Sequence, residues 1–335
     1  MTIREQQERW EEEYLSPYAS KSSRSKGRQV EEPPCDIRPI YQRDRDRILH
    51  CKAFRRLKDK TQVFFAPQGD HYRTRLTHTL EVSQNARTIA KALRLNEDLT
   101  EAIALGHDLG HTPFGHSGEH ALNRICKKGF RHYEHSVRIV EKIENKGKGL
   151  NLSYEVRNGI LNHKTSGRAD TLEGRIVRLS DKIAYLHHDI DDAIRGKMLT
   201  EEELPKEYRQ VLGMDSRTRL DRLIHDIITQ SYGKDDILMS KEIEEALFGL
   251  RKFMFQNVYT NPIVKKEEIK CENLLIALFE YYTKDIQILP EEYQEMIKRG
   301  EDEEQVICDY IAGMTDHYAL HQFQELYEPK AWSIS

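Results

Sequence analysis

The chain has 335 residues, of which 32% are charged and 38% hydrophobic, and its formal net charge is −4. This length can bury a sizeable core, and no apolar run is long enough to cross a bilayer. The net charge argues against a protein whose whole surface binds nucleic acid. Because the N-terminal residues are already charged, we expect no secretory signal, no membrane association and a cytoplasmic location. The five cysteines are scattered without a C-x-x-C pair, so neither a disulfide framework nor a thiolate zinc site is expected, and a reducing compartment is favoured.

Apolar residues recur three and four positions apart through most of the chain, which predicts an all-α fold. Residues 16–34 are rich in Ser, Lys, Arg and Pro and predict a mobile basic arm. Asn96 is a candidate helix cap, and TQVFF (61–65) is the one good strand candidate. The helical periodicity is clearest in four segments, namely 44–57, 75–95, 99–110 and 174–196.

These patterns predict three parts. Residues 1–37 are expected to form an N-terminal helix and the mobile arm. Residues 38–200 are expected to form the core that carries the chemistry. Residues 201–335 continue the helical pattern, and we expect them to pack on that core, although 200–305 contains no pattern that indicates a function.

The stretch IALGHDLGHTPFGHSGEH (103–120) gathers four histidines, one aspartate and one glutamate among small apolar residues. The dipeptide His-Asp occurs three times in the chain, so His107-Asp108 is significant only through its context. His78 and Asp181 lie on apolar faces of predicted helices, where a carboxylate requires a charge partner or a metal ion. His78, His107, Asp108 and Asp181 supply nitrogen and oxygen donors that suit Mn, Mg or Fe, with Co and Zn as alternatives. The other interpretation is four unrelated buried polar residues.

Five blocks resemble, in the same order, the signature blocks of the deoxyguanosine triphosphate triphosphohydrolase family in the HD-domain superfamily. They are RDRDRILHCKAFRRLKDKTQVF, HYRTRLTHTLEVSQNARTIA, EAIALGHDLGHTPFGHSGEHAL, RLSDKIAYLHHDIDDAI and ICDYIAGMTDHYAL, between about residues 38 and 320. The resemblance implies an HD-domain helical phosphohydrolase fold with a C-terminal helical extension. It also implies a reaction in which water attacks the α-phosphorus of a deoxynucleoside triphosphate, releasing deoxynucleoside and inorganic triphosphate.

Three residues of the histidine-rich stretch are candidates for catalysis. His111 lies four positions after His107 and can reach a substrate beside a metal ion. His116 and Glu119 are three positions apart, so the carboxylate can orient the imidazole. The resemblance implies that this pair is catalytic, and we expect His116 to protonate the leaving 5′-oxygen, an effect of roughly 10²–10⁴-fold. A helix-start hydrogen bond is the alternative for His116, and no role is expected for His120.

The chain has no Walker loop, so side chains and metal must bind the triphosphate. Most cations of the segment 42–60 are expected to pair with neighbouring carboxylates. Tyr185 and Asp189 share one helix face with Asp181, and the resemblance implies that they contact the deoxyribose. The remaining substrate contacts that the resemblance implies are Arg56 with Arg55 as an alternative, Lys182, His132 with His135 as an alternative, and Gln42 at the 3′-hydroxyl.

Two other functions fit the same residues. The first is another HD-domain nucleotide phosphohydrolase, acting on nucleoside monophosphates, cyclic dinucleotides or guanosine polyphosphates. The second is a non-catalytic nucleotide sensor or a single-strand nucleic-acid binder that uses the basic residues 21–28. The resemblance further implies a homo-oligomer. Some members of the family are activated by a second nucleotide at a subunit interface, and the sequence leaves both this activation and the base preference open.

Overall fold

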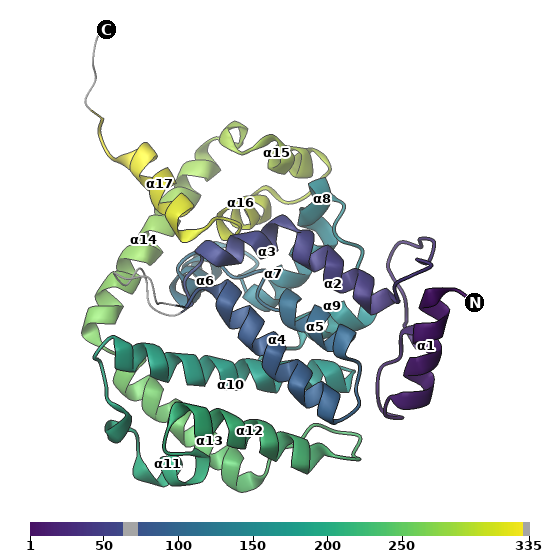
Figure 1. The fold of residues 1–335 in the computed structure, drawn as a ribbon. Coiled ribbons are helices and arrows are strands. Elements are labelled where there is room, and N and C mark those ends of the chain that lie inside the picture. Colours follow the sequence, from purple (N-terminus) through teal and green to yellow (C-terminus); the bar gives the residue numbers. More distant parts are fainter. Residues whose placement is uncertain (63–72, 331–335) are drawn as a thin grey trace.

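The structure, a computed structural model, describes residues 1–62 and 73–330 and is built from helices (Figure 1). Across these residues there is no β-strand, only the isolated bridges Arg28↔Ser153 and Thr61↔Thr74. The all-α prediction is therefore confirmed. The strand candidate 61–65 lies mostly outside the described residues. None of the described helices is both long and apolar enough to span a membrane.

The first ten helices comprise one helix in the N-terminal part and nine helices within residues 38–200. They are α1 (Ile3–Tyr14), α2 (Ile40–His50), α3 (Lys52–Arg56), α4 (Arg75–Ala92), α5 (Glu97–Gly106), α6 (Gly115–Ile125), α7 (His132–Arg138), α8 (Glu144–Gly147), α9 (Tyr154–Leu161) and α10 (Leu172–Arg195). The remaining helices are α11 (Lys206–Leu212), α12 (Ser216–Ser231), α13 (Lys241–Met254), α14 (Pro262–Lys284), α15 (Glu291–Lys298), α16 (Glu303–Ala312) and α17 (Asp316–Tyr327). A π-helical turn, Phe255–Tyr259, follows α13.

Local capping determines where several of these helices begin. The Asn96 side chain accepts from the Leu99 N–H at 3.1 Å and caps α5, as predicted. The expected helix 44–57 is divided at Cys51, which has extended backbone and accepts from the Phe54 N–H through Sγ at 3.3 Å. Because an extended residue cannot continue a helix, α2 and α3 are two short helices that change direction at Cys51.

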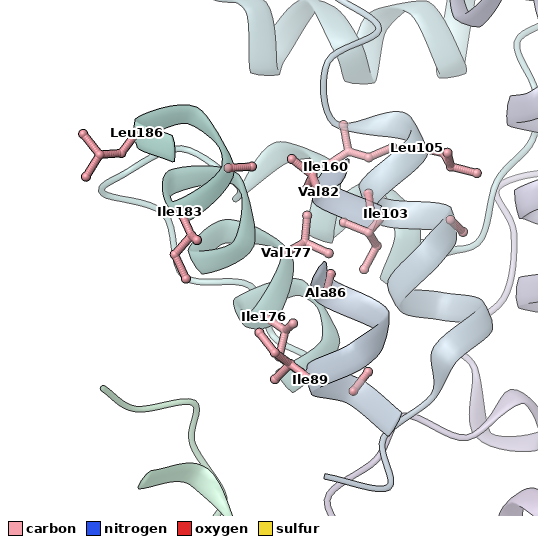
Figure 2. Packing of buried hydrophobic residues seen from close by; sticks show 14 of the residues in the cluster. Val82, Ala86, Ile89, Ile103, Leu105, Ile160, Ile176, Val177, Ile183 and Leu186 are labelled. Atoms are coloured by element: carbon pink, nitrogen blue, oxygen red, sulfur yellow. The ribbon is translucent and has the colours of Figure 1, made fainter. Parts of the chain in front are cut away.

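Two apolar cores hold the helices together. In the first, α4 packs against α5 and α10, and Figure 2 shows Val82, Ala86, Ile103 and Val177 between these helices. Helix α10 lies between α4 and the group α11–α13 (Figure 1). The second core joins α6 to α14–α17. The loop 107–114 runs from the first core to the second, so the histidine-rich stretch lies at their junction.

Residues 16–34 do not form the mobile arm that the composition predicted. The Ser22 N–H and hydroxyl donate to the buried Glu11 carboxylate at 2.6 and 2.8 Å. The Arg28 guanidinium is buried and pairs with the buried Asp44. The prediction was wrong because the polar side chains of this segment pair with carboxylates of the core. Two further cations of the segment are also paired, Arg24 with Glu12 and Lys26 with Asp170.

One pair of cysteines departs from the expectation of no disulfides. Cys126 at the end of α6 and Cys308 on α16 form a disulfide with a Cα–Cα distance of 6.8 Å. The two residues are 182 positions apart in the chain. Their pairing follows from the packing of the second core, which the spacing of cysteines along the sequence does not report.

We expect a substitution at Glu173 to reveal a pH-dependent cost of folding. Its buried Oε1 accepts from the Ser20 and Asn96 N–H groups, both at 3.0 Å, whereas Oε2 has no hydrogen-bond partner among the described residues. Burial raises the pKa of Glu173 from 4.5 to about 7. The stability contributed by this group is therefore full below pH 4.5 and is lost as the pH rises through 7.

Glu173→Gln keeps the accepting oxygen and removes the ionisation. It should raise the free energy of unfolding by roughly 1–3 kcal/mol at pH 8.5 and by much less at pH 5. Chemical denaturation at the two pH values measures this difference. An equal change in the free energy of unfolding at the two pH values would show that ionisation of Glu173 does not destabilise the fold.

Candidate active site

Four polar side chains from different parts of the chain converge between α4, α5 and α10. His78 on α4 and His107 and Asp108 after α5 are buried, and one ligand atom of each lies within 4.8 Å of the others. Asp181 on α10 joins them, with Oδ1 at 3.1 Å from His78 Nε2 and 3.8 Å from His107 Nε2. The structure therefore brings together the four residues that the sequence singled out.

The donor atoms of this group suit a divalent cation. His107 Nδ1 lies 2.6 Å from the Ala104 carbonyl oxygen. Because a carbonyl oxygen only accepts hydrogen bonds, Nδ1 must carry the hydrogen, and the lone pair of the neutral ring is then on Nε2. That Nε2 is buried without a hydrogen-bond partner among the described residues. Asp108 Oδ2 accepts from Arg75 at 2.9 Å, while Oδ1 lies 3.4 Å from Nε2 of His107. Imidazole and carboxylate donors of this kind fit a first-row divalent ion or magnesium.

A second group of rings lies beside this one. His111 is buried, and its ring stacks on that of His132 with centroids 4.1 Å apart. His132 Nδ1 lies 2.9 Å from both carboxylate oxygens of Glu119, and His132 Nε2 lies 3.2 Å from His163 Nε2. Although Asp108, His111 and His132 could also surround an ion, both ring nitrogens of His132 are already engaged. The set with His78 is therefore the better metal site.

The predicted pair His116 and Glu119 is looser than expected. His116 Nδ1 lies 3.8 Å from Glu119 Oε2, and the imidazole is 60% exposed. Burial would raise the pKa of Glu119, but the neighbouring His116 and His132 outweigh it and hold the pKa well below its usual range. Glu119 is therefore a carboxylate whose hydrogen bonds go to His132, while His116 remains free to turn towards a bound molecule.

A pocket of about 280 Å³ opens at these two groups. Its wall contains Lys182 and Tyr185, beside four of the histidines selected from the sequence: His78, His111, His116 and His132. It also contains residues that the sequence interpretation did not select: Gln62, Arg75, His163, Lys164 and Arg251. Four of the wall residues are cationic (Arg75, Lys164, Lys182 and Arg251), so the pocket suits an anion that carries several charges.

A second pocket of about 420 Å³ adjoins the first and shares His116, Tyr185 and Arg251 with it. Its wall is more aromatic, because Tyr259 and the 61% exposed Phe255 line it. The ring centroids of Tyr185 and Tyr259 are 6.3 Å apart. His120 lies at its edge and pairs with Glu272 at 3.0 Å.

Four predicted substrate residues do not line the first pocket, as far as the described residues show. Arg56 donates to the Gly313 carbonyl at 3.0 Å, and Arg55 donates to the His50 carbonyl at 2.8 Å. Asp189 is buried and its carboxylate accepts from the Tyr259 hydroxyl. Gln42 on α2 is absent from the wall as well. The alternative His135 is buried, with Nδ1 3.0 Å from the Gly110 carbonyl oxygen, and is therefore part of the scaffold.

Residues of the C-terminal half hold the histidine-rich loop in place. The buried Asp316 at the start of α17 accepts from the Thr61 N–H at 3.0 Å and from the Phe114 N–H at 2.9 Å. The buried Lys60 donates to the carbonyls of His111 and Ala312. These contacts connect both sides of the pocket to the end of the chain and explain why the block ICDYIAGMTDHYAL belongs to the site.

The pocket residues that the sequence interpretation did not select differ in whether the sequence contains a signal for them. Arg75 stands three positions before His78, so helical spacing places both on one face, and this signal could have identified it. Arg251 and Tyr259 lie within 200–305, for which no functional pattern was found. The role of 200–305 was left open by the sequence, and the packing of α13 beside α10 brings these residues to the pockets.

We expect Gly110→Ala to disrupt the site more than Gly106→Ala does. A Cβ at Gly110 would lie 2.2 Å from the Ser136 nitrogen and 2.3 Å from the His132 carbonyl oxygen, and backbone atoms cannot move aside separately. A Cβ at Gly106 would meet only the flexible ends of Ile160 and Ile48. The Gly110 variant should lose at least the roughly 1–3 kcal/mol typical of overpacking, measured by urea unfolding. A Gly110 variant as stable as the Gly106 variant would contradict this close contact.

The comparisons with known proteins agree with this geometry. A family model described as HD domain matches residues 75–186, and one described as phosphohydrolase-associated domain matches 237–325. A solved phosphohydrolase from Bacteroides thetaiotaomicron is 16% identical, covers 84% of this chain and 69% of its own, and has a TM-score of 0.55. That likeness concerns the fold alone. Together with the site, these matches define an HD-domain, metal-dependent phosphohydrolase, as the sequence predicted.

Two curated relatives identify the family. A deoxyguanosinetriphosphate triphosphohydrolase-like protein of Caldanaerobacter subterraneus is 57% identical over 99% of this chain and 98% of its own length. One of Clostridium tetani is 48% identical over 98% of this chain and 97% of its own. The chain belongs to the family of deoxyguanosinetriphosphate triphosphohydrolase-like proteins.

Proposed function

We propose that the protein hydrolyses deoxynucleoside triphosphates to deoxynucleosides and inorganic triphosphate. One observation carries this proposal: the group His78, His107, Asp108 and Asp181 opens into a pocket whose wall holds four cations. A monophosphate or a cyclic dinucleotide would leave part of this cationic wall without a partner. The names of the relatives support the same substrate class.

His78, His107, Asp108 and Asp181 would hold a divalent ion, for which Mn, Mg or Fe are the first candidates and Co or Zn the alternatives. Such an ion, when bound, polarises a phosphate oxygen and lowers the pKa of water. Asp108 stays ionised for this role because Arg75 compensates its charge at 2.9 Å. Arg75, Lys164, Lys182 and Arg251 would bind the phosphate oxygens.

The histidine group is suited to proton transfer at the reacting phosphate. The new bond joins the water oxygen to the α-phosphorus, and the bond from that phosphorus to the sugar 5′-oxygen breaks. We propose that His116 donates a proton to the leaving 5′-oxygen, since its exposed ring can turn into the pocket. Glu119 would orient His132 and stabilise the protonated His116, and His111 would contact the substrate beside Asp108.

The aromatic pocket would receive the nucleoside. Tyr185 lines both pockets, so a sugar that packs on its ring would direct the base towards Phe255 and Tyr259. Asp189 supports this wall through its contact with the Tyr259 hydroxyl, and this indirect role replaces its predicted sugar contact.

Several expectations stay predictions: the division of the chain at residues 37 and 200, the homo-oligomer, the activating nucleotide and the cytoplasmic location. A single-strand binder that uses residues 21–28 is disfavoured, because the cations Arg24, Lys26 and Arg28 face carboxylates.

Incubation with each of the four deoxynucleoside triphosphates and manganese, singly and mixed, tests the reaction. In water enriched in ¹⁸O, attack at the α-phosphorus puts the label into the released triphosphate and none into the deoxynucleoside. Asp108→Ala should form no product, because it removes a carboxylate from the centre of the site. Activity only in the mixture would reveal an activating nucleotide. Release of monophosphate or pyrophosphate would overturn the proposal.

We expect Arg251→Ala to weaken binding of the triphosphate. Losing one charge-assisted hydrogen bond of roughly 1.5–3 kcal/mol lowers kcat/KM by about 10- to 100-fold. Lys252→Ala removes the same charge from the next position, which lines neither pocket, and it should leave kcat/KM unchanged. Steady-state kinetics on both variants measures this. Equal values for Arg251→Ala and Lys252→Ala would exclude a phosphate contact by Arg251.

A further inference from the structure

A second imidazole lies directly behind His78, on the side away from Asp181. His188 on α10 is 2% exposed, and its Nδ1 lies 3.3 Å from His78 Nδ1. The two rings meet edge to face, with centroids 5.4 Å apart and an interplanar angle of 85°. On its other side, Nε2 of His188 contacts the carboxylate of Glu81. The three side chains form a continuous chain from a carboxylate to a candidate metal ligand.

The carboxylate determines where the protons of this chain must lie. An ionised carboxylate only accepts, so the nitrogen of His188 that contacts it, Nε2, must carry the hydrogen. The neutral ring of His188 then has its lone pair on Nδ1 and accepts the hydrogen on His78 Nδ1. The neutral His78 ring then has its lone pair on Nε2, and a divalent ion beside Nε2 and Asp181 Oδ1, which lie 3.1 Å apart, would accept both lone pairs. Without an ion, the Asp181 carboxylate competes with His188 for the hydrogen of the His78 ring. Reversing the hydrogen between the rings would put a proton on Nε2 and block a metal ion.

We propose that Glu81 and His188 are positioning residues that set the tautomer and orientation of His78, so that its Nε2 is free to bind the divalent ion. This inference rests on the proposed role of His78 as a metal ligand. A metal-bound histidine usually donates its other N–H to a carboxylate, a carbonyl or water. Here a second histidine stands between the ring and the carboxylate.

Helices α4 and α10 hold Glu81, His188 and His78 in these relative positions. Glu81 lies three positions after His78 on α4, and His188 lies seven positions after Asp181 on α10, so each pair shares one helix face. Arg73 approaches Glu81 to 3.4 Å and is held in turn by Asp191 and Asp192 at 3.2 and 3.3 Å. The helix pair that supplies two metal ligands therefore also supplies the groups that orient one of them.

The neighbouring His187 offers a matched control. Its ring nitrogens lie 3.2 and 3.4 Å from the Ser216 hydroxyl, and it makes no hydrogen bond with His78 in the described part of the chain. His187→Asn and His188→Asn change the same side chain at adjacent positions of α10. Asn at position 188 also retains an accepting oxygen near the place of Nδ1, whereas His188→Phe keeps the ring shape and removes the acceptor.

Manganese affinity of the full chain is the first test, measured by electron paramagnetic resonance of the free ion. We expect His188→Phe to weaken binding by roughly 10- to 100-fold, Glu81→Gln to weaken it less, and His188→Asn to restore much of the loss. His187→Asn should match the wild type. Unfolding temperatures confirm that each variant is folded, and Glu81 is 41% exposed, so its substitution tests the proposal even if α10 does not tolerate a change at position 188.

The second test uses the metal-free protein labelled with ¹⁵N-histidine. The signal of His78, identified by its loss in His78→Gln, should show hydrogen on Nδ1 in the wild type. In His188→Phe and Glu81→Gln this hydrogen should move towards Nε2, where the Asp181 carboxylate accepts it. This measurement needs neither substrate nor metal. It therefore tests the positioning role of Glu81 and His188 independently of the proposed hydrolysis. Folded variants with unchanged manganese affinity and an unchanged His78 tautomer would overturn the proposal.

Discussion

The site depends on one buried carboxylate. Asp108 is 3% exposed, and an isolated charge at such a position costs far more than a domain can tolerate unless it is compensated. Arg75 provides that compensation from one side, and His107 and His111 lie 3.4 Å away on the other. Helices α4 and α5 must therefore pack so that Arg75 and His78 face the end of α5. The geometry of the candidate metal site is a consequence of this requirement.

Because the site lies between two apolar cores, its candidate metal ligands and its candidate catalytic residues come from different cores. The metal-binding candidates belong to helices of the first core, whereas His116 and Glu119 belong to α6 in the second. The short loop that connects the cores is held at both ends, since Gly110 touches the backbone of α7 and the Lys60 and Asp316 side chains bind the backbone of His111 and Phe114. These contacts hold the buried His111 beside Asp108, whereas the exposed ring of His116 can turn into the pocket.

The two pockets provide complementary chemistry. The wall of the first contains four cations, the wall of the second adds the aromatic rings of Phe255 and Tyr259, and Tyr185 belongs to both. A nucleotide has the same polarity along its length, with an anionic phosphate chain and a flat apolar base. Arg251 and Tyr259 come from the C-terminal half, so the two pockets combine parts of the chain that the two family matches cover separately.

The sequence by itself determined the helices and the residues of the candidate metal site. Helical periodicity and caps such as Asn96 act over a few residues, and His78, His107, Asp108 and Asp181 were recognisable because each stands in a polar motif on an apolar helix. Family blocks also identified His116, Glu119, Lys182 and Tyr185 around the pocket, but they assigned Arg56 and Asp189 to contacts that these residues make with the protein instead.

Only the tertiary structure decided which groups meet across long distances in the chain. The pairing of Glu119 with His132, the disulfide between Cys126 and Cys308, and the packing of residues 16–34 all depend on contacts between separate elements. The same is true of Arg251 at the pocket and of His188 behind His78. Local spacing cannot report such contacts, because they are determined by how the apolar faces of whole helices pack, and the polar residues follow those faces.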